Sequence, residues 1–212
     1  KFTQEEIINN KGIFAKIFPI DKCAKFSEYN ISISNDLSYY SDNFLCNFEN
    51  TGVMSNGKIT TAKSKPIYQT PITLGEIIIE NADNKYYLTN EEIKKIKYLR
   101  GSKKIPRVDA NGFEYMYSEG SMSPYDSLAL PGRTMLTSEG TINRSSHIIK
   151  DPITKKFRYL TPIECERLNQ FPDDWTNTGM PDKRRYFMMG NALVCGIVKK
   201  MGCEIDKIIS NE

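Results

Sequence analysis

Hydrophobic and polar positions follow one another in short stretches along the chain, and helix-capping residues stand at the start of several of them. The clearest start is Thr161-Pro-Ile-Glu164. In this pattern the threonine and glutamate side chains accept hydrogen bonds from each other's backbone N–H groups, and proline suits the first helical position. We predict a helix that begins after Thr161 and ends at Phe171-Pro172, because a proline disfavours the helical conformation of the residue before it. We expect Ile163, Cys165 and Leu168 to face inward, and Glu164, Glu166 and Arg167 to face outward.

A further helix is predicted near the C-terminus, from Leu193 to about Ile209, with Gly190-Asn191-Ala192 leading into it and Asn191 at its start. Its apolar residues recur at helical spacing and form one stripe. The stripe consists of Leu193, Ile197, Met201 and Ile205. Without a covering domain, this stripe would be an exposed apolar patch.

The same kind of reasoning predicts the remaining elements. Capping signals at Thr3-Gln-Glu-Glu6, Thr73-Leu-Gly-Glu76 and Thr89-Asn-Glu-Glu92 predict three helices, the second ending near Asn81 and the third near Leu99. Strands are predicted at 12–18, 85–88 and 113–117, a hairpin at 51–63 with its turn at Ser55-Asn-Gly57, and a strand-loop-strand at 131–147. Residues 23–50 are rich in polar residues and are interpreted as loops or a small insertion.

Residues 94–107 contain seven cations and no acid. Such a run is consistent with a solvated helix face, and it is equally consistent with contacts to phosphate groups, because the cations continue past the expected helix end. The candidates for phosphate contact are Arg100, Lys103 and Lys104.

The segment 131–147 combines small hydroxyl side chains with arginines. Hydroxyls suit phosphates and base edges, and an arginine can bind guanine with two hydrogen bonds, so nucleic-acid recognition is one interpretation and a purely structural polar hairpin is the other. The candidate contacts are Arg133, Thr134, Thr137, Ser138, Arg144, Ser145 and Ser146.

Composition narrows the classes of protein that remain. The chain has 212 residues, 39% hydrophobic and 26% charged, which is typical of a globular protein, and no apolar run approaches the roughly 20 residues that span a bilayer. Its five cysteines form no Cys-x-x-Cys pair and it has one histidine, so we expect no metal site, no disulfide framework and a reducing cytoplasm. The net charge of +3 does not by itself indicate nucleic acid.

Two late stretches resemble a known family in the expected order. Arg158-Tyr-Leu-Thr-Pro-Ile-Glu-Cys-Glu-Arg-Leu-Asn-Gln-Phe-Pro172 closely resembles the ninth motif of the DNA (cytosine-5) methyltransferases, and Gly190-Asn191-Ala192 resembles the tenth. The family usually has glycine where this chain has Gln170. Thr134-Met135 is similar to the Thr-aliphatic pair that closes the family's target-recognition domain. The resemblance extends over about residues 130–203.

The resemblance implies an α+β protein: a small mixed, β-rich target-recognition domain with short helices, followed by C-terminal helices that belong to a Rossmann-like catalytic domain. It assigns residues 1–50 to a connector, 51–150 to target recognition and 151–212 to the closing helices. It implies that Asn191 and Ala192 lie against S-adenosyl-L-methionine (AdoMet), and that double-stranded DNA is the main partner.

The same resemblance implies a bacterial, cytoplasmic restriction-modification enzyme that transfers a methyl group to C5 of a flipped cytosine. The cysteine nucleophile of that chemistry follows a proline, and no cysteine here does. We therefore expect this chain alone to be inactive and to need a catalytic half, in the same polypeptide or a second subunit. A non-catalytic DNA-binding regulator and a protein-binding module are the alternatives.

Overall fold

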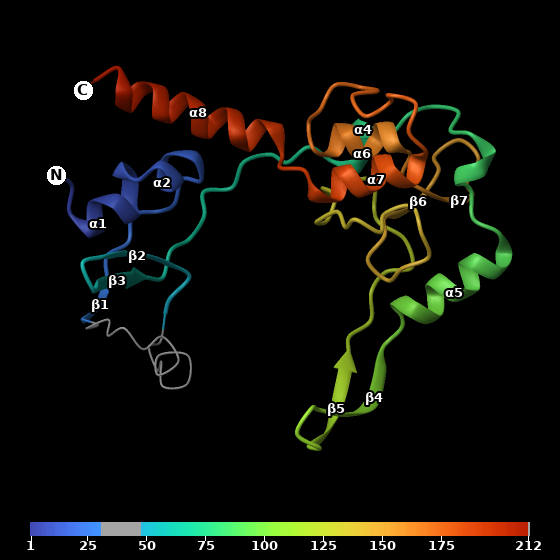
Figure 1. Cartoon of the computed structure of the whole chain (residues 1–212), viewed down its shortest axis with the longest axis horizontal. Coiled ribbons are helices and arrows are strands. Elements are labelled where there is room, and N and C mark those ends of the chain that lie inside the picture. The colour runs from blue at the N-terminus through green and yellow to red at the C-terminus, as the bar shows by residue number, and fades with distance from the viewer. Residues whose placement is uncertain (31–47, 212) are drawn as a thin grey trace. The chain divides into compact units, whose positions relative to one another are not determined.

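The computed structural model describes residues 1–30 and 48–211, and its contacts divide the chain into two compact units (Figure 1). One unit consists of Lys1–Thr70 and Ile197–Glu212, and the other of Pro71–Gly196. Helices and small antiparallel sheets make up the described residues, as the predicted α+β class requires. The division at residues 50 and 150 concerns functional segments and stays a prediction. Cys46 and most of the loop expected over 23–50 lie outside the described residues.

The first unit is built from short helices and a three-stranded sheet. Its elements are α1 (Gln4–Glu6), the π-helical turn η1 (Ile7–Lys11), α2 (Ile13–Ile17), β1 (Ser27–Asn30), β2 (Thr51–Ser55), β3 (Lys58–Ala62) and most of α8 (Cys195–Ile209). The strands are antiparallel in the order β1-β3-β2. The predicted hairpin is confirmed, and Asn56 and Gly57 at its turn have φ angles of 51° and 75°, as a two-residue turn with left-handed residues requires.

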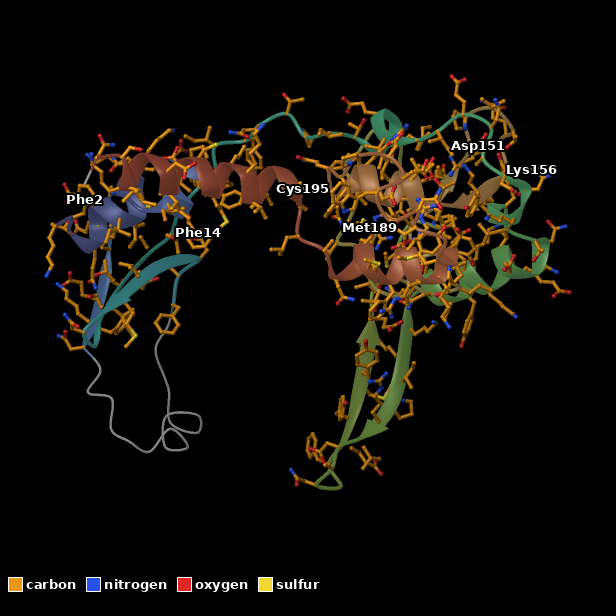
Figure 2. The ribbon with its side chains drawn as sticks, turned by 45° about the horizontal axis from the view of Figure 1, so that its top comes forward. Phe2, Phe14, Asp151, Lys156, Met189 and Cys195 are labelled. Atoms are coloured by element: carbon orange, nitrogen blue, oxygen red, sulfur yellow. The ribbon has the colours of Figure 1, made fainter. Side chains whose placement is uncertain are left out.

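The helical start at Thr3 is confirmed with its capping box, whereas the strand expected at 12–18 is wrong. These residues form α2 instead, because a short apolar run fits a helix as well as a strand. The core of this unit is small, with Ile8, Cys23 and Ala62 at its centre. Phe14 projects from α2 and is 68% exposed (Figure 2).

The last helix, α8, is close to its predicted range and begins at Cys195. None of its described residues is buried. Its exposed apolar side chains are Ile197, Val198, Ile205, Ile208 and Ile209. Of the predicted stripe, Ile197 and Ile205 are exposed on the helix, Leu193 is exposed just before it and Met201 is half-buried, so the patch is confirmed in part. No helix in the described part of the chain is long and apolar enough to cross a membrane.

The second unit contains the remaining helices and two two-stranded antiparallel sheets. Its elements are α4 (Leu74–Ile77), the 3-10 turn η2 (Asn84–Tyr86), α5 (Asn90–Arg100), β4 (Lys103–Val108), β5 (Glu114–Glu119), β6 (Ile148–Lys150), β7 (Phe157–Tyr159), α6 (Pro162–Leu168) and α7 (Asp182–Asn191). The capping boxes at Thr73, Thr89 and Thr161 are all confirmed, although α4 ends four residues before the predicted Asn81.

One apolar cluster joins the elements of this unit. It consists of Leu74, Ile77, Met135, Ile149, Leu160, Cys165, Tyr186 and Met189. These residues come from α4, the segment before β6, β6 itself, the residue after β7, and helices α6 and α7. Burial of this shared core fixes the segment around Met135 against α6 and α7.

Helix α6 ends earlier than predicted. It stops at Leu168, where Phe171 N donates to Glu166 O and Gln170 N donates to Arg167 O. This is the Schellman pattern, which needs a left-handed residue just past the helix, and Gln170 has a φ angle of 61°. The stop is therefore made by Gln170 rather than by Pro172. The glycine that the family usually has at this position would take that φ angle without steric cost.

The predicted outward faces of α6 were wrong for two of its three charged residues. Glu164 and Glu166 are fully buried, and Arg167 is half-buried. Each buried carboxylate has an arginine partner from outside the helix, which the sequence spacing within the helix cannot reveal.

Three further predictions were wrong. Residues 85–88 form the η2 turn and an isolated bridge rather than a strand, because Asp83 caps the turn by accepting a hydrogen bond from Lys85 N. The segment 131–147 contains turns and no strand. Asn191 does not begin a helix: it is the last residue of α7, which the sequence did not predict, and Ala192 is its C-cap.

Candidate functional site: the segment 133–147 and the end of α7

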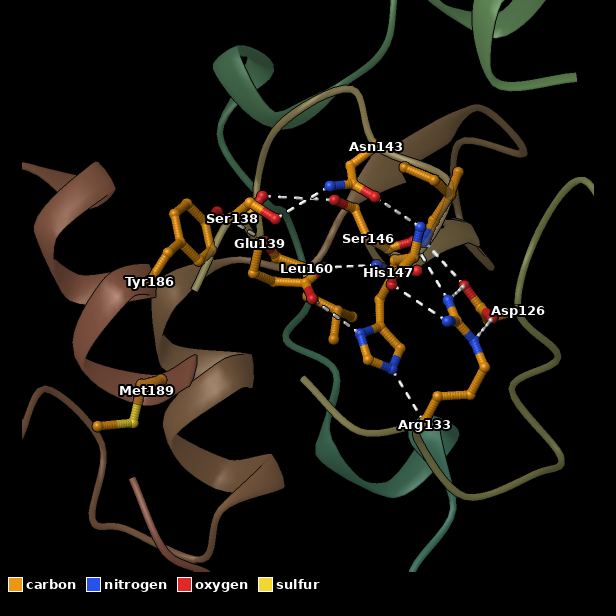
Figure 3. Close-up of polar contacts among 12 residues, drawn as sticks. Asp126, Arg133, Ser138, Glu139, Asn143, Ser146, His147, Leu160, Tyr186 and Met189 are labelled. Carbon is orange, nitrogen blue, oxygen red and sulfur yellow. Dashed lines mark hydrogen bonds and ion pairs between the residues drawn. The ribbon is translucent and has the colours of Figure 1, made fainter. Parts of the chain in front are cut away.

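A buried polar network holds the segment 133–147 in place (Figure 3). Asp126 lies at its centre: Arg133 Nε donates to Asp126 Oδ1 over 2.9 Å, and Arg100 Nη2 donates to Asp126 Oδ2 over 3.0 Å. Ile148 N donates to the same carboxylate. Burial alone would raise the pKa of Asp126, but hydrogen bonds from Arg133 and Ile148 and the charge of Arg100 outweigh it and lower the pKa.

The fully buried ring of His147 holds two points of the segment 133–147 in place. Its Nε2 accepts a hydrogen bond from Arg133 N over 2.9 Å, so its Nδ1 carries the proton and faces Glu139 Oε2 at 3.1 Å. Glu139 in turn accepts from His147 N. The residues between Arg133 and Glu139 are therefore tethered at both ends.

Between these tethers, the segment 133–139 presents its side chains in opposite directions. Met135 is 8% exposed and belongs to the apolar core, whereas Thr134, Leu136 and Thr137 are exposed. Because Met135 is anchored, the two threonine hydroxyls are held at the surface of the unit. Thr134 and Met135 are the pair that resembles the end of a target-recognition domain.

Helix α7 lies directly against this segment, and glycine makes the contact possible. A Cβ atom added at Gly190 would lie 2.3 Å from Thr137 N and 2.5 Å from Leu136 C. Both are backbone atoms, so no side-chain rotation relieves the clash. A Cβ at Gly140, whose φ is +73°, would meet the ring of Tyr186 at 2.3 Å. The tenth-motif glycine and the Thr134 segment, far apart in sequence, thus meet in space.

The predicted DNA-contact residues divide into two groups by exposure. Exposed or half-exposed are Lys103, Lys104, Arg133, Thr134, Thr137, Ser138, Arg144 and Ser145. Arg100 and Ser146 are each 1% exposed. The structure therefore corrects the role of Arg100: its guanidinium group donates to Asp126 and to the carbonyls of Ser123, Arg144 and Ser146, which leaves it no surface to offer a phosphate.

Arg133 and Arg144 also donate their hydrogen bonds to groups within the protein. Arg133 donates to Asp126 and to the carbonyls of Ser145 and Ser146. Arg144 donates to Leu99 O over 2.7 Å, to Glu119 Oε2 over 3.2 Å and to Gly120 O. We assign both arginines a positioning role, and their contact with DNA stays a prediction. Lys103 Nζ lies 4.4 Å from the ring centroid of Tyr98.

Two buried ion clusters that sequence reasoning missed support the ninth-motif helix. In the first, Arg158 Nη2 donates to Glu164 Oε1 over 2.7 Å and Arg158 Nε donates to Asp151 Oδ2 over 3.0 Å. In the second, Glu166 accepts from Arg185 Nη2 over 2.9 Å and from Thr176. The sequence held one signal for these clusters, which is that charged residues recur inside an amphipathic motif. Such residues are buried when a partner of opposite charge is present.

Asp151 makes the first cluster sensitive to acid. Burial alone would raise the pKa of Asp151, but N–H groups of Thr154 and Ile153 and the guanidinium of Arg158 outweigh it and lower the pKa to about 2. A carboxyl pKa depressed by folding adds stability above its unfolded value, near 4, and that stability is lost as the pH falls through about 2.

We therefore expect the free energy of unfolding to fall between about pH 4 and pH 2, with Asp151 contributing about 2 kcal/mol to that fall. Urea unfolding at a series of pH values measures it. Asp151→Asn should be less stable at pH 6 and should flatten this part of the curve. Glu114→Gln is the matched control, because Glu114 is an exposed carboxylate on β5. Asp109→Asn would not serve, because Asp109 caps a turn. An unchanged pH curve in Asp151→Asn would contradict the assignment.

The two buried cysteines, Cys23 and Cys165, lie in environments that disfavour a thiolate nucleophile. Burial raises the pKa of Cys165 well above the ordinary thiol value, and the nearby carboxylates of Glu139, Glu164 and Glu166 raise it further. Burial also raises the pKa of Cys23. A thiolate nucleophile needs the opposite environment. Among the described residues, no group of three or more metal-binding side chains is close enough to hold an ion.

The predicted cofactor contacts lie at the end of α7. Asn191 is exposed, and its amide nitrogen donates to Phe187 O over 3.0 Å. Its amide oxygen accepts no hydrogen bond from the described residues, so it is available to a ligand. Ala192 packs against the apolar core. Their contact with AdoMet stays a prediction.

Comparison with known sequences agrees with the class of protein that these motifs define, a DNA methyltransferase. A sequence model of the family described as C-5 cytosine-specific DNA methylase matches residues 29–207. The chain therefore belongs to the C-5 cytosine-specific DNA methylase family.

A similar protein is the type II methyltransferase M.Sau3AI of Staphylococcus aureus, which is 50% identical over 207 residues. The match covers 97% of this chain and 50% of that protein, so the chain spans about half the length of this relative. A solved structure, that of the Entamoeba histolytica methyltransferase EhMeth, is 15% identical with a TM-score of 0.41, over 91% of this chain and 54% of the other.

Proposed function

We propose that this chain is the target-recognition and closing segment of a DNA (cytosine-5-)-methyltransferase. In this role it selects a duplex site, while the reactive cysteine belongs to a catalytic half outside the chain. The enzyme would transfer a methyl group from AdoMet to C5 of a cytosine that has been taken out of the duplex, because the reactive carbons are stacked inside it. On its own the chain is expected to be inactive.

The observation that carries this proposal is the meeting of the two late motifs. Gly190 lies against the backbone of Leu136 and Thr137, so the segment that would hold the DNA backbone abuts the helix whose end would face the cofactor. A rigid contact between these parts would fix the flipped cytosine relative to the methyl donor. Positioning of this kind accounts for a large share of enzymatic rate enhancement.

AdoMet, when bound, would supply the methyl group. This chain's contribution is to present Asn191 and Ala192 at the edge of the cofactor site and to hold Thr134 and Thr137 at the surface. The exposed apolar side chains of α8 suit a helix that packs against a catalytic domain, because a contiguous apolar patch in water is typical of an interaction surface.

A second candidate is a non-catalytic DNA-binding regulator, or the small subunit of a naturally split enzyme. The sequence feature that favours this candidate is that no cysteine of the chain follows a proline, as the nucleophile of the methyltransferases does. The regulator differs from the methyltransferase segment in one measurable property, which is whether a catalytic half restores methyl transfer. The small subunit of a split enzyme would be restored as well and is a form of the first candidate.

The experiment combines the chain with the half of M.Sau3AI that it does not match, and follows methyl incorporation from labelled AdoMet into duplex DNA. We expect incorporation only when both parts are present. Thr134→Ala should lower it about 3- to 10-fold, as expected for one hydrogen bond. Thr178→Ala, an equally small change at an exposed position on a different loop, is the control and should have no effect.

Each outcome separates the candidates. Salt-dependent DNA binding without methyl incorporation would favour the regulator. A chain with neither DNA binding nor restored activity would contradict both.

A further inference from the structure

The β4–β5 hairpin extends away from the rest of its unit (Figures 1 and 2). Its strands pair from Lys103 with Glu119 to Val108 with Glu114, and almost all of their side chains are exposed. No third strand joins this sheet in the described part of the chain. A two-stranded hairpin without a supporting core is only marginally stable in water, so its retention calls for a partner.

The exposed hairpin is nevertheless tied firmly at its base. Arg144, from the segment 133–147, donates to Leu99 O and Gly101 O before β4, and to Glu119 and Gly120 O at the end of β5. Met122 N also donates to Arg100 O over 2.8 Å. The hairpin is therefore fixed to the same segment that presents Thr134 and Thr137.

One face of the hairpin carries an arginine, Arg107, whose side chain is stacked on a tyrosine ring. Arg107 lies opposite Tyr115, and its guanidinium carbon is 3.8 Å from the ring centroid of Tyr117, the diagonal neighbour on the same face. Tyr117 is itself held by a hydrogen bond to Glu119 over 3.2 Å. Stacking fixes the plane of a guanidinium group and leaves its N–H edges free to donate.

Arg107 differs in this respect from the three arginines that sequence patterns had indicated. Arg100, Arg133 and Arg144 donate to carbonyls and carboxylates of the protein. The guanidinium of Arg107 makes no hydrogen bond or ion pair with any described residue. Its N–H groups therefore remain available to hydrogen-bond a ligand at this surface.

We propose that the β4–β5 hairpin enters the major groove of double-stranded DNA and that Arg107 reads a guanine there. The major groove is wide enough for a two-stranded ribbon, and guanine offers two acceptors, O6 and N7, that match the arginine fork. Strand β4 carries Lys103, Lys104 and Arg107 and no acid. Of the acids on β5, Glu119 is already paired with Arg144.

This inference rests on the proposed function, because it assigns part of the sequence selection to a named side chain. The distinction from a mere cationic contact is testable, because a phosphate contact weakens binding to all sequences, whereas a base contact changes which sequence is preferred.

The test uses the chain assembled with the unmatched half of M.Sau3AI. Duplexes that bind are selected from a random-sequence pool, and affinity for the selected site is compared with affinity for a scrambled duplex. Arg107→Ala should reduce this ratio about 10- to 100-fold and relax one guanine position of the selected site. Arg107→Lys should not restore the ratio, because lysine lacks the planar fork.

Lys104→Ala is the matched control, since it removes one cation from the opposite face of the same strand. It should weaken binding to the selected and scrambled duplexes equally. Thermal unfolding checks that all variants fold, which is expected because the changed side chains are exposed.

If Arg107→Ala keeps the ratio within twofold while the wild-type assembly still selects a site, the inference is overturned and the proposed function stands. That result would leave the hairpin to a protein partner. A wild-type assembly that binds no DNA overturns both.

Discussion

Replacing Arg158 with methionine is expected to destabilise the second unit by about 3–5 kcal/mol, enough to unfold a protein of ordinary stability. Arg158 is fully buried and neutralises two carboxylates, those of Glu164 and Asp151. Methionine fills much of the space but leaves both carboxylates buried without a cationic partner. Urea unfolding followed by circular dichroism measures the change.

Arg184→Met is the matched control for this prediction. Arg184 is an exposed arginine on α7, and its described interaction is a contact with the ring of Phe187 at 5.1 Å. We expect its loss to change stability by less than about 0.5 kcal/mol. An Arg158→Met protein that unfolds within about 1 kcal/mol of wild type would mean that the buried ion cluster is not what stabilises α6.

The second large effect is expected at Gly190. An alanine Cβ there would lie 2.3 Å from the backbone nitrogen of Thr137, so either α7 or the segment 133–139 must move. Forced overpacking of this kind costs about 1–3 kcal/mol. A shift of about an ångström in a positioning segment costs roughly 10²-fold in rate, so methyl incorporation by the assembled enzyme should fall more than stability does.

Gly202→Ala provides the comparison for Gly190→Ala. Gly202 lies inside α8, and an added Cβ meets no atom within 4 Å. Alanine favours a helix over glycine, so this change should be neutral or stabilise by up to about 1 kcal/mol. Equal activity of Gly190→Ala and wild type would argue against a fixed contact between the two motifs.

Local signals in the sequence predicted the helix starts well. The threonine-glutamate pairs at Thr3, Thr73, Thr89 and Thr161 all form capping boxes. Each depends on residues three positions apart, so no distant contact can override it easily. The hairpin at Asn56-Gly57 was equally local, because only a few residue types accept its turn.

Features that depend on distant partners could not be predicted. Glu164 and Glu166 read as surface residues until Arg158 and Arg185 are placed beside them. Helix α7 was missed because its N-cap residue, Pro181, provides no side-chain cap and because the helix continues through a basic run. The segment 131–147 forms no strands because side chains such as Asn143 and His147 satisfy its backbone, which removes the need for a ladder.

In the candidate site, too, the features that depend on local sequence were predicted and those that depend on distant contacts were not. Sequence patterns located the segment around Thr134 and the Gly-Asn-Ala stretch, and the structure describes their contact through Gly190. Patterns of charge named Arg100 as a surface contact, although its guanidinium is buried, and included Arg107 only as one cation of the run 94–107. Which arginine is free depends on acceptors more than 20 residues away, such as Asp126 for Arg100.

The anchoring of Met135 between exposed neighbours has a consequence for how such a protein changes over evolutionary time. Thr134, Leu136 and Thr137 can be exchanged without disturbing the core, because Met135 and the tethers at Arg133 and Glu139 keep the path of the backbone. Single substitutions at these positions can therefore change the exposed surface while folding stays intact, so a library varied there would report effects on DNA binding that are separate from effects on stability.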